Sequence, residues 1–293
     1  FRFLFGWGGG LLVMFLAYNV FLAKGLLDPQ GYRAYGLTGA ILITGAVLVS
    51  AMAQHKVASG YPPRARSRFS LLTAFSELRE SFAHRAFVIL LLGGGLAYTS
   101  QGITFSISNY LYLFIWRFTP QDLAIYPWVL FASVVACFML LPLMHARWGK
   151  RDTAAATALI GACVWVTPFL LRAIGAWPSE GTAASTVPLF TLFFLSNVFS
   201  VAAMISASSM VADVVEASEE QTGRRSEGAF FAGNMFMAKC ATGLGIFTTG
   251  QLLTFAGLPE RAKPGEVPMA VIDTLSLTYA IAVAVFAVCI ALV

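Results

Sequence analysis

The stretch AFFAGNMFMAKCATGLGIFTTGQLLTFA at residues 229–256 decides the fold class, because it carries only one charged group, the ammonium of Lys239. If this stretch is a helix that begins near Gly228, a rise of about 1.5 Å per residue places Lys239 about 16 Å from the helix start. That depth is near the middle of a hydrocarbon layer about 30 Å thick. Charged residues at such a depth normally face a polar cavity or a charged partner, which favours a solute or ion pathway.

The rest of the chain is also too apolar for a soluble protein. Of its 293 residues, 58% are hydrophobic and 11% are charged, and 25 are Phe. A soluble domain of this length does not hide so much apolar surface. Eight segments are apolar and long enough to cross a bilayer as helices: 3–23, 35–54, 86–116, 125–144, 153–174, 187–212, 229–256 and 270–293. We therefore expect an all-α, polytopic membrane helix bundle.

The cationic residues between the segments predict its orientation. Twelve lie on the side of the chain start: Arg2, Lys56, Arg64, Arg66, Arg68, Arg79, Arg85, Arg147, Lys150, Arg151, Arg224 and Arg225. Six lie on the other side: Lys24, Arg33, Arg117, Arg172, Arg261 and Lys263. The excess predicts that both chain ends are cytoplasmic, in a multi-pass protein of a bacterial inner membrane. The net charge of +5 is then a topology signal and does not indicate nucleic-acid binding.

The residues that an enzyme or a metal centre would need are scattered. The four cysteines lie in apolar runs without metal-ligand or redox spacing, as expected for core or lipid-facing residues: Cys137, Cys163, Cys240 and Cys289. The three histidines lie at cytoplasmic boundaries, where solvation explains them: His55, His84 and His145. We expect no enzyme, no metal site and no cofactor. A non-transporting scaffold or receptor would need only packing, and the polar residues of 86–116 together with Lys239 argue against it.

Segment 86–116 is longer than one crossing needs and is rich in small and polar residues. They are Gly93, Gly94, Gly95, Thr99, Ser100, Gln101, Thr104, Ser106, Ser108 and Asn109. One interpretation is close helix packing alone. The other is a broken or bent helix whose backbone lines a cavity, as in discontinuous transporter helices. In that case Asn109, Tyr110 and Tyr112 are the substrate contacts nearest its outer end.

Arg2 stands at the start of the first span, just before a run of glycines that permits tight helix contact. One interpretation is a boundary residue that extends to lipid phosphates. The other is a donor to an anionic or hydroxyl-rich ligand, because a guanidinium presents a planar fork of donors.

A charged stretch joins the sixth and seventh spans, with Thr222 and Gly223 as a helix stop. It is either a solvated connector or part of a cytoplasmic gate. Asp213 comes one residue after an apolar run and so lies at the membrane edge, within reach of arginines from neighbouring loops. A carboxylate there could hold the cytoplasmic side shut and release it during a rocking motion.

Several of these motifs resemble one family. They are DVVE at 213–216, TGRRSEGAFF at 222–231, Asn234 and Lys239. The pattern is similar to the glycoside–pentoside–hexuronide:cation symporters, the melibiose permease-like branch of the major facilitator superfamily. The basic sequence RWGKR at 147–151 resembles the short loop after the eighth helix in that superfamily.

The resemblance implies helices five to twelve of a twelve-helix transporter. Residues 1–54 are then the last two helices of the N-terminal six-helix bundle, 55–85 the central cytoplasmic loop, and 86–293 the C-terminal bundle. It places Lys239 near the cation and substrate sites, with Asn234 in the same motif, and Arg2 in reach of the sugar. It makes a cytoplasmic gate of Asp213, Glu216, Thr222, Gly223, Arg225, Glu227 and Gly228. The coupling ion, sodium or proton, is expected to bind carboxylates on earlier helices that this chain lacks.

The resemblance therefore implies cation-coupled symport of a sugar or glycoside by alternating access. Met204 and Met235 stand where melibiose-type members have a tryptophan and a threonine, which removes stacking and hydrogen bonding. The alternative is a lysophospholipid-like or other amphiphilic solute on the same scaffold. The expected partners are a small-molecule substrate and the lipid bilayer, with no nucleic acid, in a protein that is monomeric at full length.

Overall fold

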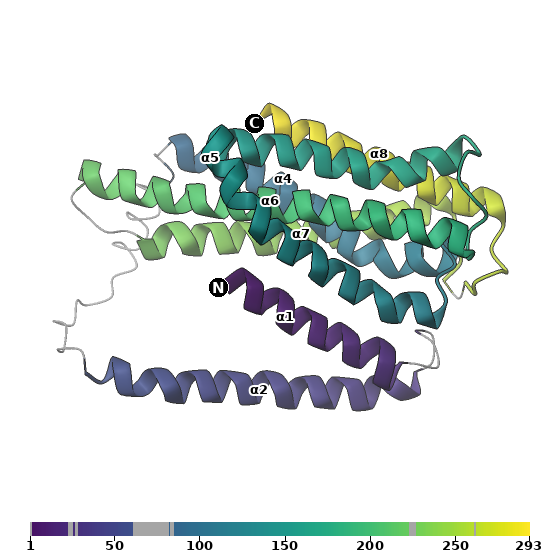
Figure 1. Ribbon diagram of the computed structural model, residues 1–293, viewed down its shortest axis with the longest axis horizontal. Coiled ribbons are helices and arrows are strands. Elements are labelled where there is room, and N and C mark those ends of the chain that lie inside the picture. The colour runs from purple at the N-terminus through teal and green to yellow at the C-terminus, as the bar shows by residue number, and fades with distance from the viewer. Residues whose placement is uncertain are drawn as a thin grey trace.

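The computed structural model describes residues 2–22, 26, 29–60, 82, 85–222, 227–260 and 262–293. These residues form a bundle of long helices that run alternately in opposite directions (Figure 1). In chain order they are α1 (Arg2–Phe15) with the π-helix η1 (Leu16–Phe21), α2 (Gln30–Ala58), α4 (Arg85–Tyr110) with the π-helix η2 (Leu111–Ile115), α5 (Pro120–Ala173), α6 (Ala183–Thr222), α7 (Glu227–Ala256) and α8 (Met269–Leu292). The predicted all-α membrane bundle is confirmed.

Six helices of the described chain are long and apolar enough to cross a membrane, and Phe5–Phe21 is a shorter apolar helix. One of the six, α5, contains both predicted spans 125–144 and 153–174. Its 54 residues turn back at Gly149, whose φ of 74° is in the left-handed region that glycine adopts without strain. The two segments of α5 therefore run in opposite directions, as Figure 1 shows. We call the end of the bundle where α4 and α7 begin the proximal end, and the opposite end the distal end.

Helices α4 and α7 cross at close range through small residues. A Cβ atom on Gly102 would lie 2.6 Å from the carbonyl oxygen of Thr242, and one on Gly245 would overlap the carbonyl oxygen of Thr99. Close backbone approach of this kind is how membrane helices gain packing without a hydrophobic driving force. The packing interpretation of 86–116 therefore fits. The alternative of a broken or bent helix applies only near the distal end of 86–116, because α4 is continuous from Arg85 to Tyr110 and leaves α-helical geometry at η2.

The largest apolar cluster lies toward the distal end and joins η2, α5, α6 and α8. Its fully buried side chains include Trp116, Phe169, Phe193 and Tyr279. The Trp165 indole donates to the Tyr279 hydroxyl at 2.8 Å, and that hydroxyl donates to Thr104 at 3.0 Å. Three helices are thus tied together by paired polar groups inside an apolar core, which avoids the cost of burying them alone.

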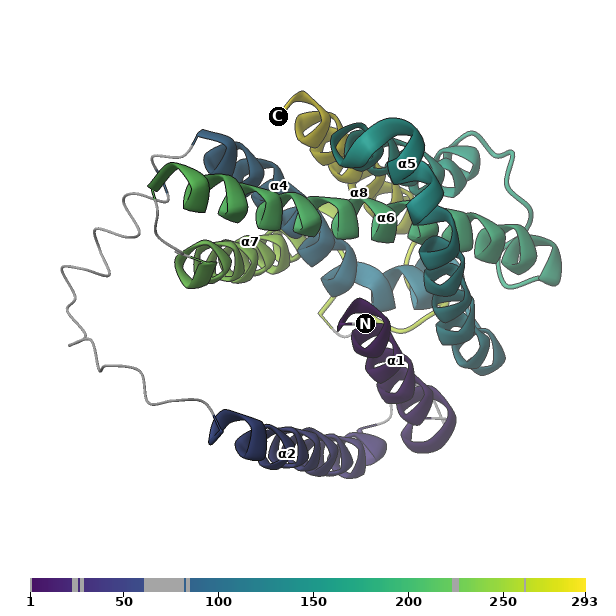
Figure 2. The same cartoon turned by 60° about the vertical axis from the view of Figure 1, so that its left-hand side comes forward.

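The first two helices lie to one side of this bundle. Helix α1 packs on α5, with the rings of Phe15 and Trp128 edge to face at 6.2 Å. Helix α2 contacts η1, and Figure 2 shows it apart from α4 to α8 with α1 between. Nearly all side chains of α2 are exposed in this chain. Most of the predicted central loop 55–85 lies outside the described residues.

Candidate functional site

Lys239 lies on the exposed side of α7, about 18 Å along the helix from its start at Glu227. The buried side chains of α7 include Phe230, Ala241, Gly245 and Thr249, and they face α4. At about 100° per residue, Lys239 points roughly opposite to that side. Among the residues that the structure describes, its ammonium has no ion pair.

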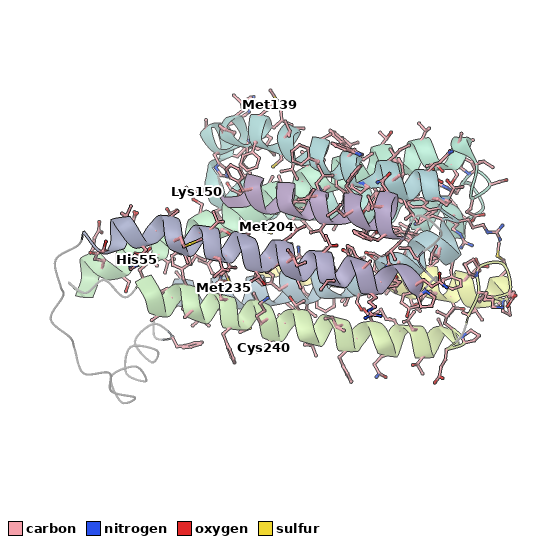
Figure 3. All side chains as sticks on the ribbon, turned by 90° about the horizontal axis from the view of Figure 1, so that it is seen from below. His55, Met139, Lys150, Met204, Met235 and Cys240 are labelled. Atoms are coloured by element: carbon pink, nitrogen blue, oxygen red, sulfur yellow. The ribbon has the colours of Figure 1, made fainter. Side chains whose placement is uncertain are left out.

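The exposed side of α7 divides into two sectors of different chemistry. One carries Cys240 and large apolar side chains, Phe236, Leu244, Phe247 and Phe255, and suits contact with lipid. The other carries Met235, Lys239, Gly243, Ile246 and Gly250, so glycines alternate there with exposed apolar side chains around the one cation. Figure 3 shows Met235 and Cys240 on opposite edges of α7. Lys239 therefore lies on the second sector, away from the run of exposed Phe side chains.

Helices α4 and α7 run parallel, which fixes the relative depth of the predicted site residues. The Phe87 ring packs on Phe230 at 4.7 Å, and the Thr249 hydroxyl donates to the Ile103 carbonyl at 3.2 Å. Lys239 is thus level with residues 93–96, near the middle of α4, and Asn109 is about 20 Å farther toward the distal end. The structure does not bring Asn109 and its neighbour Tyr110 to the level of Lys239.

Tyr112 is a core residue in this structure. Its side chain is 4% exposed, its hydroxyl donates to that of Tyr126 at 2.7 Å, and its ring stacks on Phe118. The sequence predicted a substrate contact, but the chain turns into the π-helix η2 at Leu111 and directs this ring against α5. The predicted role of Tyr112 does not fit its position.

Asn234 and Arg2 do not join Lys239 either. Asn234 is half-buried and, at five residues from Lys239, lies about 140° away around the helix, on the side of α4. Arg2 begins α1, and its side chain lies outside the described part of the chain. Lys239 therefore stands apart from the other predicted site residues whose side chains the structure describes, and its role stays a prediction.

The predicted gate contains a salt bridge at the proximal end. The Lys150 ammonium donates to both carboxylate oxygens of Asp213, at 2.7 and 2.8 Å. The positive φ of Gly149 brings the basic sequence 147–151 against α6. The partner is a lysine, where the sequence suggested arginines, and it joins α5 to α6 within one group of helices. Both side chains are about half exposed, at 40% and 51%, so the pair alone stabilises the fold by at most about 1 kcal/mol.

The remaining gate residues are placed only in part. Glu216 is exposed one turn after Asp213, on a helix that continues to Thr222, so the charged stretch is helical over most of its length. The described part of α6 ends at Thr222, whose side chain lies outside the description, as do Gly223 and Arg225, so the predicted helix stop stays a prediction. Glu227 begins α7, and Gly228 has open space around it.

Sequence reasoning missed a second contact near Lys150. His145 Nε2 lies 2.7 Å from the hydroxyl of Ser206, a fully buried residue. Because that hydroxyl donates to the carbonyl of Ala202, it accepts from His145, whose Nε2 therefore carries a proton. No local pattern predicts this contact, since His145 and Ser206 are on different spans.

Sequence reasoning also missed the structural role of a cation near the distal end. Arg172 is only 7% exposed and donates through Nε to Glu180 at 2.8 Å and through a terminal nitrogen to Asp273 at 2.7 Å. The sequence predicts a loop cation at this position. In the structure, Arg172 lies in the last turn of α5 and joins the end of α5 to the start of α8. In the described chain, no group of three or more His, Cys, Asp or Glu side chains is placed to hold a metal ion.

Membrane-length helices in alternating directions, with polar residues inside the bundle and charges at its proximal end, indicate a multi-pass membrane protein. The model of the MFS/sugar transport protein family matches residues 1–293, and the chain belongs to that family. This confirms the family resemblance seen in the sequence and places the chain among transport proteins and not among enzymes. The chain is also similar to an uncharacterized symporter of Synechocystis sp., with 27% identity over 91% of this chain and 60% of that protein. It thus spans less than two thirds of the relative's length.

Proposed function

We propose that the chain is part of a secondary active transporter that carries a sugar or glycoside together with sodium or a proton. The single observation on which this depends is Lys239, an exposed cation in the middle of a membrane helix. The family's printed description as a sugar transport protein and the relative's name as a symporter support the proposal. The ion-binding carboxylates are proposed to lie on helices outside this chain.

The proposed mechanism is alternating access. Helices α1 and α2 belong to one rocking half and α4 to α8 to the other, and α1 slides or pivots on α5. Lys239 pairs with carboxylates of the opposite half in one state. Sodium or a proton competes with Lys239 for these carboxylates, so the ion and the substrate shift the same conformational equilibrium through their differential affinities.

The proximal end is proposed to face the cytoplasm of a bacterial inner membrane. The salt bridge between Lys150 and Asp213 then holds the turn of α5 against α6 on that side. Glu216 and the charged residues up to Gly228 form the surrounding gate, and opening of the cytoplasmic side would loosen these contacts. The pair acts within its own half, so it stiffens the gate rather than closing the two halves directly.

The experiment is uptake by the full-length protein in proteoliposomes, with and without a sodium or proton gradient. Lys239→Ala and Lys239→Arg should abolish gradient-driven uptake, whereas Lys263→Ala, an exposed loop lysine, should not. Equal gradient-driven uptake by wild type and Lys239→Ala would contradict the role of Lys239.

A second candidate substrate is an amphiphile of the lysophospholipid type. It is favoured by Met204 and Met235, flexible apolar side chains at positions where a sugar site would use stacking and hydrogen bonds. Counterflow with matched panels of glycosides and lysolipids separates the two. Exchange of lysolipids alone would discard the sugar proposal and leave the transporter class intact.

A further inference from the structure

Helix α4 carries a polar and aromatic stripe that none of its described neighbours covers. The helix lies between α7 and α8 (Figure 2). Its small residues Thr99 and Gly102 face α7, and Thr104 faces α8 through Tyr279. On a third side, Tyr98 is half-buried and Gln101, Phe105 and Asn109 are exposed, with Phe105 at 84%. Their spacing of three and four residues places them on one face of the helix.

At its own level, this stripe is opposite the buried core side of α4, where Ile103 and Ile107 are fully buried. Only nearer the proximal end does that opposite side carry exposed apolar side chains, Ile89 and Leu92. At about 100° per residue, the direction of Phe105 is roughly opposite to theirs. Amide side chains in membrane helices face the protein interior or a hydrated cavity, because lipid cannot satisfy their hydrogen bonds. The stripe therefore faces the interior, toward the other half of the molecule.

The same face of α4 is buried at both ends. Near the proximal end, Phe87 and Leu91 pack in a cluster with Val214 and Val215 of α6. Near the distal end, Tyr112 is closed off by its hydrogen bond to Tyr126 of α5. Only the middle, from Tyr98 to Asn109, is uncovered by the described helices. From Gln101 to Asn109 this length is about 12 Å, enough for one or two sugar rings.

We propose that Tyr98, Gln101, Phe105 and Asn109 recognise a neutral, hydroxyl-rich solute with an apolar ring face. The amides of Gln101 and Asn109 each offer donors and an acceptor, which match hydroxyl groups. Between them the Phe105 ring presents a flat surface for the C–H face of a sugar. The stripe carries no charge, which favours neutral glycosides over sugar acids. This inference rests on the proposed function and names the substrate class and its contacts on α4.

The first test is thiol accessibility, which needs no known substrate. Gln101→Cys, Phe105→Cys and Asn109→Cys are placed in a cysteine-free background of the full-length protein, with Leu92→Cys as the lipid-facing control. A membrane-impermeant maleimide should label the three stripe positions and not the control. Absence of labelling at all three positions, in both inward-facing and outward-facing conditions, means that another helix covers the stripe and overturns the proposal.

The second test is counterflow, which reports exchange without ion coupling. Gln101→Ala and Asn109→Ala should weaken the apparent affinity for a neutral glycoside by about tenfold each, the loss expected for one or two hydrogen bonds. Phe105→Ala should act similarly, Phe105→Trp should restore affinity, and Leu92→Ala should leave it unchanged. Unchanged affinity in all three alanine variants overturns the stripe as a recognition surface. If these three variants keep their affinity while Lys239→Ala loses gradient-driven uptake, the stripe proposal is overturned and the proposed transport function is not.

Exchange of a sugar acid in preference to its neutral counterpart would overturn the proposed substrate class. Exchange of no glycoside at all, together with labelled stripe cysteines, would overturn the sugar assignment and point to another solute. These results are separable from a failure of ion coupling, because counterflow does not depend on the gradient.

Discussion

The Lys150 ammonium lies 2.7 and 2.8 Å from the two carboxylate oxygens of Asp213, across 63 positions of sequence, and ties the turn of α5 to α6. The neighbouring contact between His145 and Ser206 joins the same two helices. These two contacts give the proximal end of the bundle a defined polar connection between α5 and α6.

Breaking this pair should change transport more than stability. Because both side chains are about half exposed, Lys150→Ala or Asp213→Asn should cost at most about 1 kcal/mol of unfolding free energy. We expect each single variant to alter the uptake rate and the swap Lys150→Asp with Asp213→Lys to recover part of it. Proteoliposome uptake and thermal unfolding in detergent measure the two quantities. If the loss of uptake rate in the swap variant equals the sum of the losses in the two single variants, the pair has no direct role.

The close crossing of α4 and α7 predicts that Gly102 tolerates no side chain. Gly102→Ala places a methyl group 2.6 Å from the Thr242 carbonyl oxygen, a backbone atom that cannot move away freely. We expect a loss of stability of about 1–3 kcal/mol, as for other overpacked interfaces. Gly39→Ala on α2, where no atom of the described chain lies within 4 Å, is the matched control and should be neutral. Equal melting temperatures of the two variants would refute the crossing.

Arg172 should be needed for the distal end to hold together. Replacing it with Gln leaves the half-buried carboxylate of Glu180 without its cation and should lower stability by about 1–3 kcal/mol. Arg172→Lys should recover only part of the lost stability. An ammonium cannot reproduce the planar guanidinium that donates to Glu180 and Asp273 together. Arg33→Gln, on an exposed site of α2, should have little effect. Thermal unfolding in detergent checks the order of the three variants.

The buried hydroxyl pair of Tyr112 and Tyr126 can be separated from substrate binding. Tyr112→Phe leaves the Tyr126 hydroxyl without its partner and should cost about 1–3 kcal/mol, whereas the double change to Phe should be closer to neutral. Neither variant should alter the apparent affinity for substrate, because the Tyr112 side chain is buried in the core. A loss of affinity in Tyr112→Phe without a loss of stability would support the original prediction that Tyr112 contacts the substrate.

The fold class could be predicted from composition and segment length, because a bilayer accepts only structures that satisfy their backbone hydrogen bonds internally. The start of a new helix near Glu227 was also predictable, since Thr-Gly followed by Glu is a local signal. The separation of Asn234 from Lys239 follows from helix geometry alone, although the shared motif suggested one site. The burial of Tyr112 was not predictable. The π-helical turn η2 rotates the residues that follow it around the helix axis, and the α-helical periodicity of the sequence does not show this rotation.

The sequence alone determined that this protein crosses a membrane several times, that it belongs among transport proteins, and that Lys239 is a cation at mid-depth. The membrane spans and the depth of Lys239 depend on local composition and helix rise, which act within one segment. Membership among transport proteins rests on the family match over the whole chain. Only the tertiary structure decided that Asp213 pairs with Lys150, that Arg172 joins α5 to α8, and which face of α4 stays uncovered. Such contacts join residues far apart in the chain, so they depend on how helices pack and rotate against one another, which no single segment encodes.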